Sequence, residues 1–219
     1  MPQTATNRRT RREVCPEQLT AAALELFLEH GYSATRMEDV ARAAGVSKGA
    51  IYLYFPNKEA LFHAVIREGV VARVEEAEAT VAAHRGSARD LLDRLMHGVL
   101  LDFWGSPSSG IPKLMIAEAR AFPELARDYF ESVSLRSREL LERILQRGVD
   151  EGEFRSMDVR NTARAIMAAL EHQPVLYHSL GEHDPQPLEP RPFVDAMMDL
   201  VTRGLLHTRA TDAGDRHDG

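Results

Sequence analysis

The stretch from residue 35 to residue 58, TRMEDVARAAGVSKGAIYLYFPNK, constrains the fold of this chain more than any other part. Its first half places apolar residues at three- and four-residue steps from Met37 to Ala44. This spacing predicts a short helix that begins near Arg36 and has one apolar face. Because glycine tolerates the left-handed backbone conformation that closes a helix, we expect this helix to end at Gly45.

The second half of the stretch predicts another short helix. The hydroxyl of Ser47 is placed to cap its free amides, and the spacing directs Ile51 and Phe55 inward. The residues on the outward side are Lys48, Gly49, Tyr52 and Leu53. Two helices joined by so tight a turn predict a helix-turn-helix, a motif whose second helix enters the major groove of DNA.

The rest of the chain shows helical periodicity and no strand-like alternation. Pro16 fits the first position of a helix that ends at Gly31, and Asn57 is placed to cap a helix that runs past residue 80. A broad apolar face then extends from residue 88 to residue 104. Further helices are predicted over residues 112–121, 123–151, 158–178 and 192–207. The predicted fold is therefore all-α, with about nine helices.

These patterns predict four segments. Residues 1–15 form a basic disordered arm, residues 16–62 a helix-turn-helix DNA-binding domain, residues 63–207 a larger ligand-binding and dimerisation domain, and residues 208–219 a disordered tail. Residues 1–62 hold 8 Lys+Arg against 7 Asp+Glu, whereas the remainder holds 19 against 26, within a net charge of −6. The arm either lies along DNA or only solubilises the chain, and both interpretations stay open. Its arginines are Arg8, Arg9, Arg11 and Arg12.

Composition excludes several classes of protein. The chain has no run of 18 or more apolar residues and no hydrophobic segment after its polar start, so we expect no membrane span and a cytoplasmic protein. A single cysteine, Cys15, excludes an internal disulfide. The nine histidines show no zinc-site spacing, and no motif for a nucleophile or a phosphate-binding loop occurs. We therefore expect no metal, no cofactor and no enzymatic activity.

The chain closely resembles the TetR family of transcriptional regulators. The resemblance rests on AALELFLEHGYSAT, MEDVARAAGVSKGAIYLYF and NKEALF and, farther on, on MIAEARAFPELA and GEFRSMDVRNTARAI. It implies an all-helical homodimer that binds a palindromic DNA operator and is released when an inducer binds a pocket in the C-terminal domain. The alternative is a helical interaction protein that binds DNA weakly or not at all and acts through that domain.

The resemblance assigns phosphate contacts to Thr35, to Tyr54 or Tyr52, and to Lys58. Hydroxyl and amine groups suit phosphate oxygens and fix docking without reading sequence. Base reading falls to the second helix of the motif, where Lys48 can donate to guanine. The predicted DNA-binding residues are Thr35, Arg36, Ser47, Lys48, Gly49, Tyr52, Tyr54 and Lys58.

Methionines and large aromatic residues on wide apolar stripes predict the effector pocket, because such side chains adapt to an apolar ligand. Glu118, Glu171 and His172 interrupt apolar helices and are candidates for its polar contacts, although exposure at a helix edge is the competing interpretation. The predicted pocket residues are Met96, Leu100, Phe103, Trp104, Met115, Glu118, Phe122, Phe130, Met167, Leu170, Glu171 and His172.

Two further apolar stripes predict the dimer interface. One runs from Phe193 to Leu206 and the other from Val159 to Leu170. Paired across a two-fold axis, they would form a four-helix interface. The competing interpretation is that both stripes face the core of their own subunit.

Overall fold

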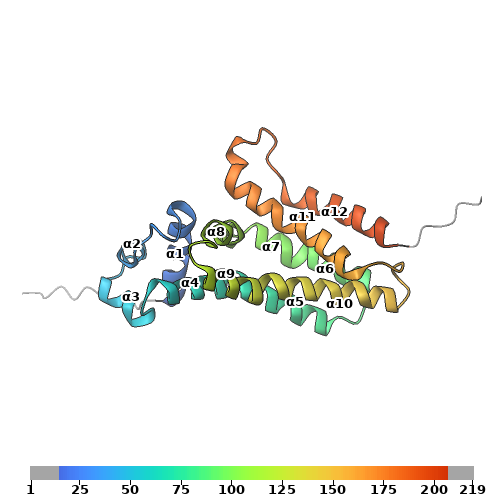
Figure 1. Ribbon diagram of the computed structural model, residues 1–219, viewed down its shortest axis with the longest axis horizontal. Coiled ribbons are helices and arrows are strands. Elements are labelled where there is room, and N and C mark those ends of the chain that lie inside the picture. Colours follow the sequence, from blue (N-terminus) through green and yellow to red (C-terminus); the bar gives the residue numbers. More distant parts are fainter. Residues whose placement is uncertain (1–14, 207–219) are drawn as a thin grey trace, which may run out of the picture. The chain divides into compact units, whose positions relative to one another are not determined.

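The structure is a computed structural model that describes residues 15–206 of the chain. The chain divides into two compact units, Met1–Val65 and Ile66–Gly219. Every regular element between residues 15 and 206 is helical, and that range contains no strand (Figure 1). The all-α prediction is confirmed. The predicted basic arm and C-terminal tail lie outside the described residues, apart from Cys15 at the start.

The first unit contains three short helices and the start of a fourth. They are α1 (Pro16–His30), α2 (Met37–Ala43), α3 (Lys48–Tyr54) and α4 (Lys58–Ile66). Its core is partly aromatic. The ring of Phe27 lies 5.4 Å from those of Tyr32 and Phe62, and the latter two are 4.7 Å apart between centroids. These contacts hold α1, the turn after it and α4 together, so the short helices gain stability that helices of seven residues lack in isolation.

Local signals end and begin these helices where the sequence predicts. Gly31 and Gly45 have φ values of 85° and 71°, in the left-handed region that glycine adopts without strain. Beyond Gly45, the amide of Val46 donates to the carbonyl of Ala41 across 2.9 Å, which closes α2. The side-chain oxygen of Asn57 accepts from the amide of Ala60 at 2.7 Å and caps α4.

The second unit continues the same helix and adds five more. Helical conformation runs from α4 through the π-helical turn η1 (Arg67–Val71) into α5 (Ala72–Ala83). The other elements are α6 (Ala88–Leu95), η2 (Met96–Leu100), α7 (Leu101–Trp104), η3 (Pro107–Gly110), α8 (Ile111–Glu118), α9 (Pro123–Tyr129), η4 (Phe130–Leu135), α10 (Arg136–Asp150), α11 (Val159–Leu180), η5 (Gly181–His183) and α12 (Pro190–Leu205). When elements without a break between them are counted as one helix, residues 15–206 form nine helices.

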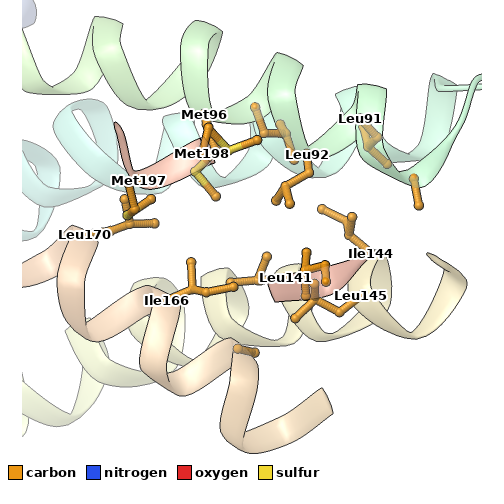
Figure 2. Close-up of a cluster of buried hydrophobic side chains, with 14 of the residues drawn as sticks. Leu91, Leu92, Met96, Leu141, Ile144, Leu145, Ile166, Leu170, Met197 and Met198 are labelled. Atoms are coloured by element: carbon orange, nitrogen blue, oxygen red, sulfur yellow. The ribbon is translucent and has the colours of Figure 1, made fainter. Parts of the chain in front are cut away.

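The core of the second unit lies between α6, α10, α11 and α12. Figure 2 shows Leu91 and Leu92 of α6 across from Ile144 and Leu145 of α10, and these four side chains are at most 1% exposed. The apolar stripes of α11 and α12 complete the same cluster. Burial of so many apolar side chains is the main force that stabilises this unit.

The structure corrects the predicted dimer interface. On α12, Val194 is fully buried and Met197 and Met198 are 7% and 6% exposed within a single subunit. On α11, Ala163 and Ile166 are buried in the same cluster. The two stripes therefore face their own core, because amphipathicity identifies an apolar face without identifying what covers it.

None of the helices between residues 15 and 206 combines the length and hydropathy that a bilayer-spanning helix needs.

Candidate DNA-binding face and effector cavity

One face of α3 is open to solvent. Ile51 is fully buried and anchors the helix, whereas Tyr52 is 40% and Leu53 83% exposed. Gly49 lies on the same side, and a Cβ atom built on it would meet no atom within 4 Å. This face carries no side chain that holds the backbone away from a neighbouring molecule, which is the geometry that a helix needs to lie in a major groove.

The start of α3 is fixed by two polar contacts. The Oγ atom of Ser47 accepts from the amide of Ala50 at 3.2 Å, so this hydroxyl is the N-cap of the helix. The ammonium of Lys48 lies 2.7 Å from Oε1 of Glu38 on α2. This hydrogen bond lowers the pKa of Glu38 and raises that of Lys48. Because both side chains are solvated, the pair is weak and leaves Lys48 able to exchange its partner for a base.

Thr35 is buried, whereas a contact with a DNA phosphate needs an accessible hydroxyl. The residue is 3% exposed. Its Oγ1 atom lies 2.8 Å from the carbonyl oxygen of Gly31 and 3.2 Å from that of Leu26, to which it donates. This almost fully buried hydroxyl holds the turn after α1, and in this conformation its single proton is directed at these carbonyl groups and not at solvent.

Lys58 is also directed inward. Its Nζ atom donates to the carbonyl oxygens of Tyr32, Ser33 and Thr35 at 2.7, 3.2 and 3.0 Å. It lies 4.4 Å from the centroid of the Tyr32 ring. Since an ammonium has three protons, three carbonyl acceptors match its donor capacity. The predicted phosphate ligand is in this structure a clamp between the start of α4 and the turn that precedes α2.

The two remaining predicted DNA contacts are accessible. Arg36 is exposed and is the residue that immediately precedes α2. Tyr54 is 43% exposed at the end of α3. Of the eight predicted residues, six are therefore exposed, Lys58 is half-buried and Thr35 is buried.

A mostly apolar cavity of about 180 Å³ lies inside the second unit. Seven of the predicted pocket residues line it: Met96, Leu100, Phe103, Trp104, Met167, Leu170 and Glu171. Sequence reasoning missed the wall formed by α5 and α10, which includes Val74, Leu140 and Ile144. The apolar periodicity of these helices was visible, but nothing local distinguishes a residue that lines a cavity from one that fills a core.

A second cavity of about 390 Å³ adjoins the first. Met115 and Phe130 line this outer cavity and not the main one. The two cavities share Pro112, Tyr129, Met167 and Glu171 in their walls.

Glu118, Phe122 and His172 line neither of these two cavities. His172 is exposed, since a step of one residue along α11 turns its side chain about 100° away from that of Glu171. Phe122 is the N-cap residue of α9, and Glu118 is the last residue of α8. The structure thus brings nine of the twelve predicted pocket residues to the two adjoining cavities.

Burial changes the acidity of the polar groups at the shared wall. Glu171 is accessible from the cavities yet crowded by protein, and this burial raises the pKa of its carboxyl, against the opposing charge of Arg138. Burial also raises the pKa of Tyr129, and the nearby Glu171 charge raises it further. Both groups thus favour their neutral forms more than the same side chains do in water.

His97 and His178 each contact a polar side chain of a neighbouring element. Nε2 of His97 lies 2.8 Å from Oδ1 of Asp195, and Nε2 of His178 lies 2.8 Å from Oγ of Ser109. Across residues 15–206, no group of three or more histidine, cysteine or acidic side chains is arranged to hold a metal ion.

Comparison with known protein families covers most of the chain. Residues 19–65 match the model described as bacterial regulatory proteins of the tetR family. Residues 100–207 match the model described as the C-terminal domain of AefR-like transcriptional repressors.

Individual relatives agree with these matches. The uncharacterized HTH-type transcriptional regulator YfiR of Bacillus subtilis is 30% identical over 140 residues, which are 63% of this chain and 66% of YfiR. The fatty acid metabolism regulator protein of the same organism is 26% identical over 155 residues, 70% of this chain and 78% of that protein. The chain thus spans about two thirds to three quarters of the length of these relatives.

A solved structure shares the fold. The FadR regulator of Bacillus subtilis, solved in complex with stearoyl-CoA, superposes with a TM-score of 0.67 over 86% of this chain and 98% of its own. At 21% identity this similarity shows the fold alone.

Proposed function

This chain belongs to the TetR family of bacterial transcriptional regulators, and from that premise we propose that it is a repressor that binds a palindromic operator as a homodimer and leaves it when a small hydrophobic effector binds. The observation that carries the DNA-binding part is the open face of α3. Lys48, Gly49, Tyr52 and Leu53 share that face while Ile51 anchors the helix. A helix that is fixed on one side and bare on the other is able to dock into a major groove.

The chemistry of the open face suggests what it reads. Lys48 is a donor for guanine acceptors, and Tyr52 and Leu53 offer apolar surface to a thymine methyl group. Leu53 supports this most directly, since an 83% exposed leucine has no role in the core of its own unit. Tyr54 and Arg36 flank the face and would contact phosphates.

The effector part of the proposal rests on the main cavity. Its wall combines flexible methionines with aromatic side chains and few polar groups, which suits an apolar ligand. A relative of this chain is named a fatty acid metabolism regulator, and a protein of the same fold has been solved with stearoyl-CoA. Both support an effector with a substantial apolar part. Release follows only if the effector binds more tightly to a conformation that does not fit the operator.

The predicted stripes are mostly buried in their own subunit, so another surface is the better candidate for a homodimer interface. Large apolar side chains remain exposed on the outer faces of the last two long helices: Leu176 is 37% and Leu180 57% exposed on α11, and Leu200 is 72% exposed on α12. We propose that these residues form the two-fold interface. A dimer would place two recognition helices about 34 Å apart, one turn of DNA, or a multiple of that distance.

A gel-retardation assay with the DNA upstream of the protein's own gene tests the proposal. We expect a retarded complex that resists nonspecific competitor DNA and is lost in the Tyr52→Ala variant. Lys48→Ala should relax sequence preference at a cost of about 1–3 kcal/mol. Arg160→Ala, an exposed cation on α11, is the matched control and should bind normally.

Two outcomes would contradict the proposal. If the Tyr52 and Lys48 variants both keep full operator affinity, α3 is not the reading helix. If no fragment is retarded in preference to competitor DNA, the alternative of an interaction protein that acts through its second unit gains support.

A further inference from the structure

We infer that the effector is an amphipathic anion whose apolar part fills the main cavity and whose carboxylate or phosphate group contacts Arg138 and Arg164 in the outer cavity. The inference rests on the proposed function and names the chemical class of its effector.

The division of chemistry between the two cavities is the first argument. The main cavity is lined almost entirely by apolar side chains. The outer cavity is lined by two guanidinium groups, Arg138 on α10 and Arg164 on α11, together with the hydroxyl of Ser134. The main cavity alone, at about 180 Å³, is small for a ligand site, and the outer one adds about 390 Å³. A ligand with one apolar and one anionic end uses both.

The second argument is that the two arginines retain unused donor capacity. Among residues 15–206, Arg164 makes no hydrogen bond or ion pair, and its side chain is exposed. Nε of Arg138 is buried without a hydrogen-bond partner and lies 3.6 Å from the nearest oxygen of Glu142. A buried donor without a partner costs free energy that a bound anion would recover. A guanidinium also matches the planar shape of a carboxylate or phosphate.

A third cation, Arg73, lines the main cavity but is already occupied. Its Nη1 atom lies 3.0 Å from Oε2 of Glu76, one turn along the same helix. An anion at Arg73 would have to compete with this carboxylate, as one at Arg138 would with Glu142, whose Oε1 atom lies 3.6 Å from Nε of Arg138. Within residues 15–206, Arg164 has no such competitor. This difference places the anionic group in the outer cavity.

The only acidic side chain in either wall is Glu171. Glu142 pairs with Arg138, so Arg164 is the surplus cation of the outer cavity, and burial raises the pKa of Glu171, which weakens its repulsion of an anion. A cationic amphiphile would meet net repulsion at the same place. The sign of the charge thus distinguishes the two ligand classes.

The shared wall separates the cavities, and an alkyl chain that uses both would have to pass it. Pro112, Tyr129, Met167 and Glu171 line both sides. Met167 is unbranched and only partly buried, so its rotation could open this wall at low cost. An alkyl chain that enters from the arginine side would pass Met167 to reach Trp104 and Phe103 in the main cavity.

The test compares four probes with the same twelve-carbon chain: dodecanoate, dodecyl phosphate, dodecanol and dodecyltrimethylammonium, each kept below micelle formation. Trp104 is the only tryptophan of the chain and lines the main cavity, so its fluorescence reports binding. We expect both anions to bind more tightly than the alcohol and the cation to bind worst. The ratio of the two anions distinguishes a carboxylate source from a phosphate source.

The variants Arg164→Gln and Arg138→Gln test the assigned contacts. Each should weaken anion binding by about tenfold or more, the loss expected for a charge-assisted hydrogen bond, and leave dodecanol binding unchanged. Arg160→Gln, one turn before Arg164 on α11 and absent from both cavity walls, is the control and should behave like the wild type.

Different experimental outcomes would contradict the inference and the proposed function. Equal affinity for all four probes, tightest binding of the cation, or no binding of any probe would each overturn the inference. If the alcohol releases the operator as well as the anions do, the effector-controlled repressor stands and only the charge assignment is wrong. If operator DNA is never bound, the proposed function fails whatever the probes do.

Discussion

Lys58 makes contacts that stabilise the helix-turn-helix unit itself. Its ammonium joins the start of α4 to three carbonyl groups of the turn between α1 and α2. Its position in the family motif predicts a contact with a DNA phosphate. Its contacts in the structure instead stabilise the motif itself. The two roles make different predictions for stability.

We predict that Lys58→Met lowers the free energy of unfolding by about 1–3 kcal/mol, because three carbonyl acceptors, two of them in part-buried hydrogen bonds, lose a charged donor. Chemical denaturation followed by circular dichroism measures the change. Lys48→Met is the matched control: its ammonium is solvated beside Glu38, so its stability should stay within about 0.5 kcal/mol of the wild type. A Lys58 variant of normal stability that no longer binds DNA would restore the phosphate role.

Gly148 gives a second prediction at this scale. A Cβ atom built on it would lie 2.1 Å from the Phe154 ring, which is 2% exposed. We predict that Gly148→Ala destabilises the protein by about 1–3 kcal/mol, because the ring must leave its packed position. Gly98→Ala, where the added methyl meets nothing within 4 Å, should be neutral or stabilising by up to about 1 kcal/mol. Equal thermal midpoints for the two variants would contradict this packing argument.

At the scale of elements, the main cavity coincides with π-helical turns. The turns η1, η2 and η4 interrupt three separate long helices, and each contributes to the wall through Val70, Met96 or Val133. π-helical turns are rare and often occur at functional sites, because each inserts one extra residue and displaces the backbone. All three π-helical turns between residues 15 and 206 therefore contribute to the wall of the main cavity.

Another contact between elements joins α11 to the segment before and within α8. Nε2 of His178 lies 2.8 Å from Oγ of Ser109, and Lys113 donates to the carbonyl oxygen of His178 at 2.6 Å. Burial, and then the charge of Lys113, lower the pKa of His178. The contact therefore favours the neutral imidazole.

This lowered pKa predicts a loss of stability in acid. The unfolded chain takes up a proton at His178 near pH 6.5, while the folded chain does so only at lower pH. Stability should therefore fall as the pH drops below about 6.5, and His178→Gln should reduce that fall. Urea denaturation at pH 7.5 and 5.5 measures it as the difference between wild type and variant. An identical pH dependence in both proteins would show that this histidine does not contribute.

The difference must be measured against the wild type because His97 acts in the opposite direction. A hydrogen bond to the carboxylate of Asp195 raises the pKa of His97, so its contribution to stability is present in acid and lost as the pH rises through its folded value. Since both proteins keep His97, its effect cancels in the comparison.

At the scale of the whole molecule, the proposed dimer depends on the exposed leucines of α11 and α12. We predict that Leu200→Glu gives a folded monomer, because a side chain 72% exposed is not needed by its own subunit, whereas a charge opposes burial between subunits. Light scattering measures the mass, and operator affinity should fall with it. Arg203→Glu is a charge-changing control that leaves the leucines intact. A Leu200→Glu dimer with full operator affinity would place the interface elsewhere.

Most of the fold was predictable because the signals are local. Gly31 and Gly45 end helices, and Asn57 and Ser47 begin them, through contacts that span at most five residues. The order and extent of the helices follow from such signals and from apolar periodicity. The outward face of α3 follows in the same way, since burial of Ile51 places Leu53 outside.

Three features were decided only by tertiary structure. Lys58 finds acceptors 23 to 26 residues away in the sequence, so no local pattern reveals its role. The apolar stripes of α11 and α12 are covered by their own subunit, and only packing determines what covers a stripe. Arg138 and Arg164 lie in one cavity wall because α10 and α11 pack together. Local backbone preferences therefore determine the helices from sequence, whereas contacts between distant segments determine what each side chain does.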